Sequence, residues 1–226
     1  MELRLSLHEV ISKSTQALRA LNFPPGLDIE NGKNIGWLES RGLPGLQMLV
    51  EEIKAASDTS NRSPIEINIM KDTVQFSSQG YSAFNFAQST VDFAENGKTV
   101  SVEKCRFPLL IFAEMARRKH LPFGFYAQWI KDDEIITGAT ISGNSELTIN
   151  SRKLTTAYDL NITTTKNLII KDPLEKKLSS KSAFEENGIN CDPDNWKAIC
   201  ATAKKVLVPD SEQSHSSAGA EVDDSK

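Results

Sequence analysis

The chain has 226 residues, of which 39% are hydrophobic and 25% charged, so a hydrophobic core is expected and wholesale disorder is excluded. Its net charge of -4 argues against a nucleic-acid interface that relies on bulk positive charge. There is no apolar run long enough to span a membrane, no secretory signal and no disulfide framework among the three cysteines, so we expect a cytosolic protein without membrane or nucleic-acid partners.

Residues 1–56 predict an N-terminal unit of three helices with short connections. Ser6 and Glu9 have the spacing of a capping box, which marks the start of the first helix. Asp28 is the expected N-cap of the second helix. Gly42 follows the end of that helix, where a left-handed backbone conformation is favoured.

The segment 64–171 predicts a mostly antiparallel sheet, because apolar and polar residues alternate along several short runs. Asn96 and Gly97 form the dipeptide most typical of a tight hairpin turn, so residues 90–104 are expected to be two antiparallel strands. One helix, over 107–119, is inserted between the strands of this sheet.

The C-terminal part contains a predicted loop, a helix and a tail. Residues 172–191 are rich in lysine and serine and are expected to be a loop. Asp192 is the expected cap of a helix over 192–208. The acidic Ser/Ala/Gly tail, 209–226, has a composition typical of disorder. The order of elements predicts an α+β protein, and we expect one compact domain.

The chemistry-bearing residues form no recognisable catalytic or metal-binding motif. His8, His120 and His215 lie in separate segments, and no pair of cysteines has the spacing of a zinc site. We therefore expect no metal and no cofactor, and the sequence leaves open whether the protein is an enzyme.

The second predicted helix is the first candidate contact surface. Gly32 and Gly36 share one face of it, where glycine permits either close packing of another backbone or the approach of a ligand. Trp37 belongs to the adjoining face. Arg41 follows the helix, where it would either bond to the last carbonyl groups or hold an anionic group.

Several motifs are similar to those of a bacterial family of uncharacterised proteins. The most specific is W-L-x-x-R-G-L-P-G, which begins at Trp37. The segment around Arg106 and the tail motifs V-P-x-S-E-x-S, from Val208, and A-G-A, from Ala218, also resemble the family. The family has a domain of unknown function, so the resemblance implies a shared fold and no particular reaction. It also raises the expectation that the tail is ordered.

Two functions remain open on the sequence. The first is the binding of a partner protein or a small metabolite, without chemistry of the protein's own. The alternative is a small enzyme, or an accessory subunit of one, that uses carboxylate and hydroxyl groups from the second helix and the tail. The candidate contact residues are Glu30, Gly32, Trp37, Arg41, Arg106, Ser211, Glu212, Ser214, Gly219, Asp223 and Asp224.

Overall fold

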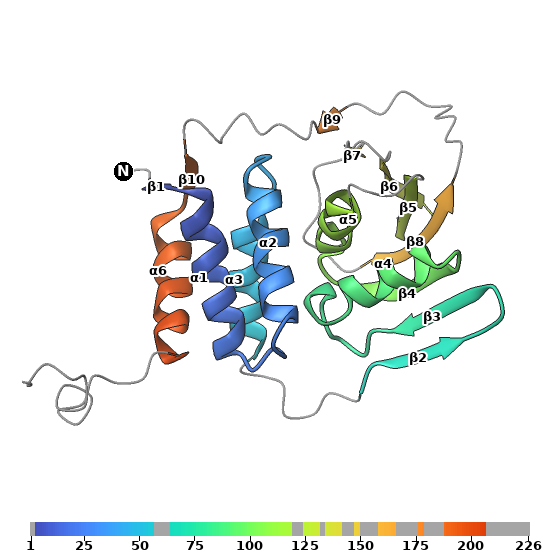
Figure 1. Ribbon diagram of the computed structural model, residues 1–226, viewed down its shortest axis with the longest axis horizontal. Helices are drawn as coiled ribbons and strands as arrows, with labels where there is room; N and C mark the ends of the chain where they lie inside the picture. Colours follow the sequence, from blue (N-terminus) through green and yellow to red (C-terminus); the bar gives the residue numbers. More distant parts are fainter. Residues whose placement is uncertain are drawn as a thin grey trace, which may run out of the picture.

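The computed structural model combines a group of helices with a large sheet (Figure 1). It describes residues 3–56, 64–118, 124–131, 134–141, 147–149, 158–165, 176–178 and 188–206. The predicted tail, 209–226, and all of its candidate contact residues lie outside the described part of the chain.

Four helices stand side by side next to the sheet (Figure 1). They are α1 (Leu7–Ala20), α2 (Leu27–Glu39), α3 (Gly45–Ala55) and α6 (Pro193–Ala203). The predicted capping box forms at the start of α1, where the Glu9 amide donates to Ser6 Oγ and the Ser6 amide donates to the Glu9 carboxylate. Asp192 caps α6 by accepting from two backbone amides. The predicted three-helix unit and the C-terminal helix are therefore confirmed.

The larger sheet has the strand order β2-β3-β4-β8-β5-β6-β7-β9. Its strands are β2 (Glu66–Ile69), β3 (Thr73–Ser77), β4 (Thr99–Cys105), β5 (Gly124–Lys131), β6 (Glu134–Ile141), β7 (Leu147–Ile149), β8 (Tyr158–Thr165) and β9 (Lys176–Leu178). Among the described pairs, β3 and β4 are parallel and the others are antiparallel. The predicted α+β class, with a mostly antiparallel sheet, is confirmed.

The predicted hairpin at Asn96 and Gly97 is wrong, because a helix, α4 (Ala87–Glu95), precedes this turn. Gly97 has a φ of +80°, and its amide and that of Lys98 donate to Ala94 O and Phe93 O, which together close the end of the helix. A hairpin turn and a helix end both require a positive φ at glycine, so the dipeptide suits either structure. The sheet segment therefore contains two inserted helices, α4 and the predicted α5 (Pro108–Arg117), together with a short 3-10 turn over Ala83–Asn85.

Asp28 does not cap α2. The helix begins two residues earlier than predicted, at Leu27 with Gly26 in the cap position, and Asp28 is buried in its first turn. The carboxylate accepts from Arg19 Nε at 2.8 Å and from the amides of Gly26 and Ile29. A buried carboxylate is stable only with such partners, and Asp28 finds them in the first turn of the helix.

The predicted loop 172–191 contains two short strands among its described residues. One is β9, and the other is β10 (Ile189–Cys191), which pairs with β1 (Leu3–Leu5) in a separate two-stranded sheet. This pairing joins the entry to α1 with the entry to α6. Strands of three residues carry too little periodicity to be recognised from the sequence.

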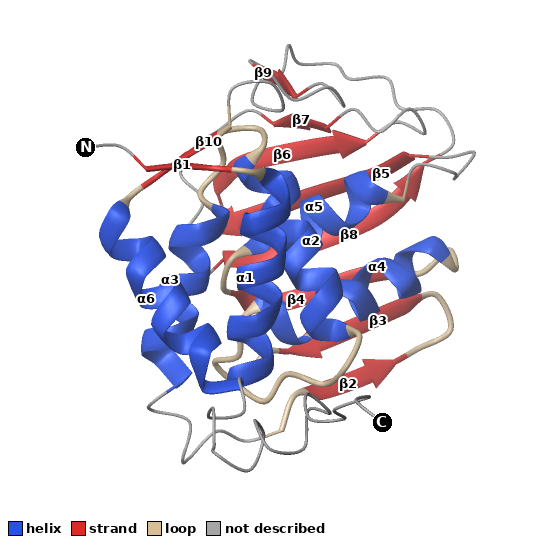
Figure 2. Cartoon of the chain, turned by 60° about the vertical axis from the view of Figure 1, so that its left-hand side comes forward, coloured by secondary structure: helices blue, strands red, loops and turns tan. Residues whose placement is uncertain are grey.

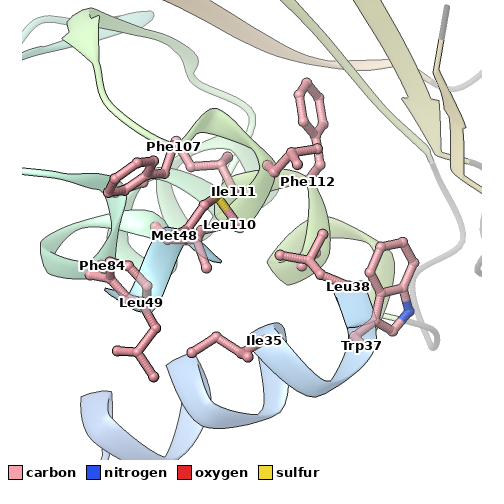
Figure 3. Close-up of a cluster of buried hydrophobic side chains, with 14 of the residues drawn as sticks. Ile35, Trp37, Leu38, Met48, Leu49, Phe84, Phe107, Leu110, Ile111 and Phe112 are labelled. Atoms are coloured by element: carbon pink, nitrogen blue, oxygen red, sulfur yellow. The ribbon is translucent and has the colours of Figure 1, made fainter. Parts of the chain in front are cut away.

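The main hydrophobic core joins the helical group to the sheet. Figure 2 shows α4 and α5 against one face of the sheet, and α2 packs on α5 from the other side. Figure 3 shows apolar side chains of α2 and α3 meeting those of α5 and of the segments before it. The labelled residues are Ile35, Trp37, Leu38, Met48, Leu49, Phe84, Phe107, Leu110, Ile111 and Phe112. This core fixes α2 relative to β3 and β4.

Gly32 is where α1 and α2 pack most closely. A Cβ atom there would lie 2.2 Å from Thr15 Oγ1 and 3.1 Å from the Ile11 carbonyl oxygen, so the Gly32→Leu substitution must push α1 away. We expect it to lower the free energy of unfolding by about 1–3 kcal/mol, as overpacked cores do. Lys33→Leu places the same residue at an exposed position of α2 and is the control. Urea denaturation would contradict this expectation if Gly32→Leu were no less stable than Lys33→Leu.

Candidate functional site

The first turns of α2 carry a polar contact with α5. Arg117 donates to the Glu30 carboxylate at 2.6 Å and to Asn34 Oδ1 at 2.7 Å. Lys33 also donates to Glu30, at 2.7 Å. Burial raises the pKa of the Glu30 carboxyl, but the hydrogen bonds from Lys33 and Arg117 outweigh it, so the pKa lies below its usual value. Glu30 is thus held ionised in a contact between helices.

A second ion cluster joins α4 to α5 around Arg118. Its guanidinium group lies 2.6 Å from the Asp92 carboxylate and 3.1 Å from the carboxylates of both Glu95 and Glu114. Glu114 is buried and also accepts from Asn34 Nδ2 at 3.0 Å. Charged groups in this cluster are paired with one another, which favours a structural role for it.

Arg41 contacts the last turn of α2. Its guanidinium group lies 4.0 Å from the centre of the Trp37 ring and donates to the Trp37 carbonyl oxygen at 3.0 Å. Arg41 therefore bonds to one of the last carbonyl groups of the helix, which is one of the two roles that the sequence allows.

Arg106 lies at the end of β4 and faces α3. One of its guanidinium nitrogens is 3.7 Å from Glu52 Oε2, a buried atom without a hydrogen-bond partner among the described residues. The guanidinium carbon lies 4.8 Å from the centre of the Phe107 ring. Arg106 thus places a positive charge between the end of β4 and α3.

A pocket of about 240 Å³ opens at the carboxyl ends of the parallel strands β3 and β4. Its lining residues come from the end of β3 and the loop after it, and from the end of β4. They are Ser77, Ser78, Gln79, Gly80, Glu103 and Lys104. The connection through α4 brings the two carboxyl ends together, and such ends are frequent sites of ligand binding in sheets with parallel strands.

The backbone around the pocket adopts an uncommon conformation. Gln79, Lys104 and Phe107 have φ values of +51°, +49° and +60°, respectively, in the left-handed region that residues other than glycine seldom occupy. Such conformations cluster at functional sites, where the fold holds a segment in a strained shape. The conformation of Lys104 marks the point where the register between β4 and β8 shifts.

Hydrogen bonds connect the two sides of the pocket. The Glu103 carboxylate accepts from Ser77 Oγ at 3.0 Å and from Gln75 Nε2 at 2.8 Å. Ser78 Oγ donates to the Lys104 carbonyl oxygen at 3.4 Å. The pocket therefore presents hydroxyl groups, a carboxylate and an ammonium group on a fixed frame.

The structure separates the candidate residues that the sequence grouped together. Glu30 and Gly32 lie in the first half of α2, Gly32 against α1, while Trp37 and Arg41 contact each other at its end. Arg106 lies two residues beyond Lys104 of the pocket.

The pocket residues themselves were not candidates on the sequence. The run Ser77-Ser78-Gln79-Gly80 after a strand was an available signal of a ligand-binding loop. The sequence does not show that this loop meets the end of β4, because that contact depends on the crossover through α4.

Residues 5–80 match a family model described as "Protein of unknown function (DUF3726)". This part of the chain is thus similar to a family of unknown function, and the match covers about a third of the chain. The match runs from the end of β1 through α1, α2, α3, β2 and β3 into the loop that lines the pocket. It confirms the expected resemblance to a family of unknown function over these residues. No curated protein matches the chain.

Solved structures of dehydrogenases share the fold. A putative malate/lactate dehydrogenase from E. coli is 8% identical with a TM-score of 0.61, covering 94% of this chain and 97% of that one. A dehydrogenase from Sinorhizobium meliloti is 11% identical with a TM-score of 0.59, covering 90% of this chain and 100% of that one. Malate dehydrogenase from Entamoeba histolytica is 11% identical with a TM-score of 0.46, and the match covers 70% of this chain but only 49% of that one. At these identities the likeness to the first two structures shows the fold alone.

In the described ranges, no helix is both long and apolar enough to cross a membrane. The same part of the chain holds no group of three or more histidine, cysteine or acidic side chains arranged to bind a metal ion.

Proposed function

We propose that this protein binds a small polar metabolite with an anionic group, and that the ligand occupies the pocket at the carboxyl ends of β3 and β4. The observation that carries the proposal is the pocket itself, because polar side chains from two parallel strands converge on one cavity of about 240 Å³. Pockets for drug-sized ligands measure roughly 300–1,000 Å³, so this smaller pocket suits a metabolite of a few carbon atoms.

The lining supports a ligand of this chemistry. The Lys104 ammonium group can donate a hydrogen bond to a carboxylate or a phosphate. The Ser77 hydroxyl donates its proton to Glu103, so its oxygen can accept from a hydroxyl group of the ligand. The Glu103 carboxylate can accept from a hydroxyl or amine group of the same ligand.

A second candidate is an oxidoreductase that acts on a hydroxy acid. It is favoured by the fold likeness to a putative malate/lactate dehydrogenase and to a second dehydrogenase, both over nearly the whole chain. Malate and lactate each bear a carboxylate and a hydroxyl group, the two functions that the pocket lining could receive. The two candidates differ in turnover, so incubation of the protein with malate or lactate and an electron acceptor, followed by assay for a keto acid, separates them.

The proposed location is the cytosol. All three cysteines are free thiols, which suits a reducing compartment.

Replacing Lys104 with glutamine tests the proposed binding site. Calorimetric titration with malate, lactate and phosphate is expected to show binding of at least one of them, and Lys104→Gln to weaken it by about tenfold or more, because a charge-assisted hydrogen bond is lost. Lys197→Gln removes an exposed lysine of α6 and is the matched control. Equal affinity of both variants, or no binding of any of the three anions, would contradict the proposal.

A further inference from the structure

The outer edge of β2 is open among the described residues. β2 is the first strand of the larger sheet and pairs only with β3 (Figures 1 and 2). The strand is apolar despite its position, since Ile67 is 47% exposed, Ile69 is 59% exposed and Met70, which follows the strand, is 49% exposed. An exposed apolar edge strand can pair with a strand of another chain, and proteins usually blunt or cover such edges.

The two isoleucines share the face of the sheet that the helices cover. Ile67 lies opposite Phe76 and Ile69 opposite Val74, and opposite residues of antiparallel strands point to the same side. Phe76 and Val74 are fully buried, and Phe76 contacts Phe93 of α4 at 6.0 Å between ring centres. The apolar layer under α4 therefore continues onto Ile67 and Ile69, where the cover of α4 ends.

The backbone of the same two residues faces outward. The Met70 amide donates to Thr73 O across the turn between β2 and β3. Residues alternate along an antiparallel pair, so Asn68 also bonds toward β3, while the N–H and C=O groups of Ile67 and Ile69 point to the open edge.

We propose that β2 pairs with β2 of a second copy of this chain, antiparallel and around a two-fold axis at Asn68. If the helices of both copies lie on the same side of the joined sheet, each residue must pair with one of the same face. Ile67 then pairs with Ile69 of the second copy, and Ile69 with its Ile67. The outward-facing backbone groups of both residues are satisfied in these two pairs, and the four isoleucines form one apolar patch between the two α4 helices.

The charges at the ends of β2 support this antiparallel arrangement. Glu66 begins the strand, and Lys71 follows it directly before Asp72, so Glu66 of one copy lies near Lys71 of the other. A parallel arrangement would bring like charges together. Because β2 has only four residues, we expect a dimer that dissociates on dilution.

A disulfide tests the register. Non-hydrogen-bonded residues opposite each other have Cα atoms about 4.5 Å apart, within the range of a disulfide. Asn68→Cys is therefore expected to form a covalent dimer of the full chain under mild oxidation. Gln75→Cys, on the same face of neighbouring β3, and the parent protein with its three native cysteines are the controls and are expected to remain monomeric on a non-reducing gel.

Opposite charges test the pairing without a disulfide. Ile67→Glu and Ile69→Lys each place a charge at an exposed edge position, so both chains are expected to fold, which thermal denaturation checks. Each variant alone is expected to associate about tenfold more weakly than the parent in sedimentation equilibrium, and a mixture of the two to regain association, because the introduced glutamate and lysine lie opposite each other in the mixed dimer. A parent chain that is monomeric at every concentration, or association unaffected by either variant, would overturn the proposal.

Discussion

Arg118→Met is expected to lower the free energy of unfolding by about 3 kcal/mol or more at neutral pH, as breaking a buried ion pair does. The Arg118 side chain is 20% exposed and forms ion pairs with three carboxylates, one of which, Glu114, is only 5% exposed as a side chain. Burial lowers the pKa of Arg118. The charge of Glu114 and the hydrogen bond and charge of Asp92 together raise it by a larger amount, so the pKa lies above its usual value. Methionine keeps much of the apolar stem and removes only the charged group, leaving Glu114 with less compensation.

A double-mutant cycle separates the charge effect from lost packing. Glu114→Gln removes the buried negative charge, so Arg118→Met is expected to be less destabilising in that background than in the parent. Arg19→Met, which removes a half-exposed partner of Asp28, is the matched control and is expected to be additive with Glu114→Gln. Chemical denaturation of the parent, the three single variants and the two double variants measures both couplings. Strict additivity of Arg118→Met with Glu114→Gln would contradict the assigned contact.

The parent protein is expected to lose stability as the pH rises from 4.5 to about 7, and the Glu39→Gln variant is expected not to show this loss. Burial raises the pKa of the Glu39 carboxyl from 4.5 to about 7, although the backbone amides of Leu46 and Gly45 act in the opposite direction. The folded protein therefore binds this proton more tightly than the unfolded chain. Its contribution to stability is full below pH 4.5 and is lost as the pH rises to about 7.

The expected size of this effect is about 3 kcal/mol, since each pKa unit corresponds to about 1.4 kcal/mol. Above pH 7 the glutamine variant is thus expected to be more stable than the parent, because its amide oxygen still accepts from the Leu46 amide and carries no buried charge. Urea denaturation of both proteins from pH 4 to pH 8 measures the difference between them. A constant difference across this range would show that Glu39 does not titrate in it.

The local structure of the helical unit was predictable from the sequence, because its signals act within a few residues. The Ser6 and Glu9 capping box, the positive φ of Gly42 and the cap at Asp192 all form as expected. These contacts depend on backbone groups no more than three residues from the side chain or on the conformational freedom of glycine itself. The choice between a packed and an open face at Gly32 required the tertiary structure, since only the position of α1 decides it.

The region from 87 to 106 shows where local signals are insufficient. Asn96 and Gly97 specify a turn with positive φ, and the same dipeptide can close a hairpin or a helix. The segment forms a helix because this conformation buries one apolar face of it against the sheet. Phe93 packs on Phe76, and Thr90, Val91 and Ala94 are buried. Parallel pairing of β3 with β4 follows from that crossover.

The candidate pocket is likewise a product of tertiary structure. Its two sides, 77–80 and 103–104, are more than twenty residues apart in the sequence and meet because α4 returns the chain to the same edge of the sheet. Of the candidate residues chosen from the sequence and described in the structure, Arg106 is the one adjacent to the pocket in the chain. The sequence alone determined the class of fold, the helical unit and the free thiols, because propensity, capping and composition are local properties. Only the tertiary structure decided which polar residues share a cavity and which apolar edge is left exposed, because both depend on contacts between distant segments.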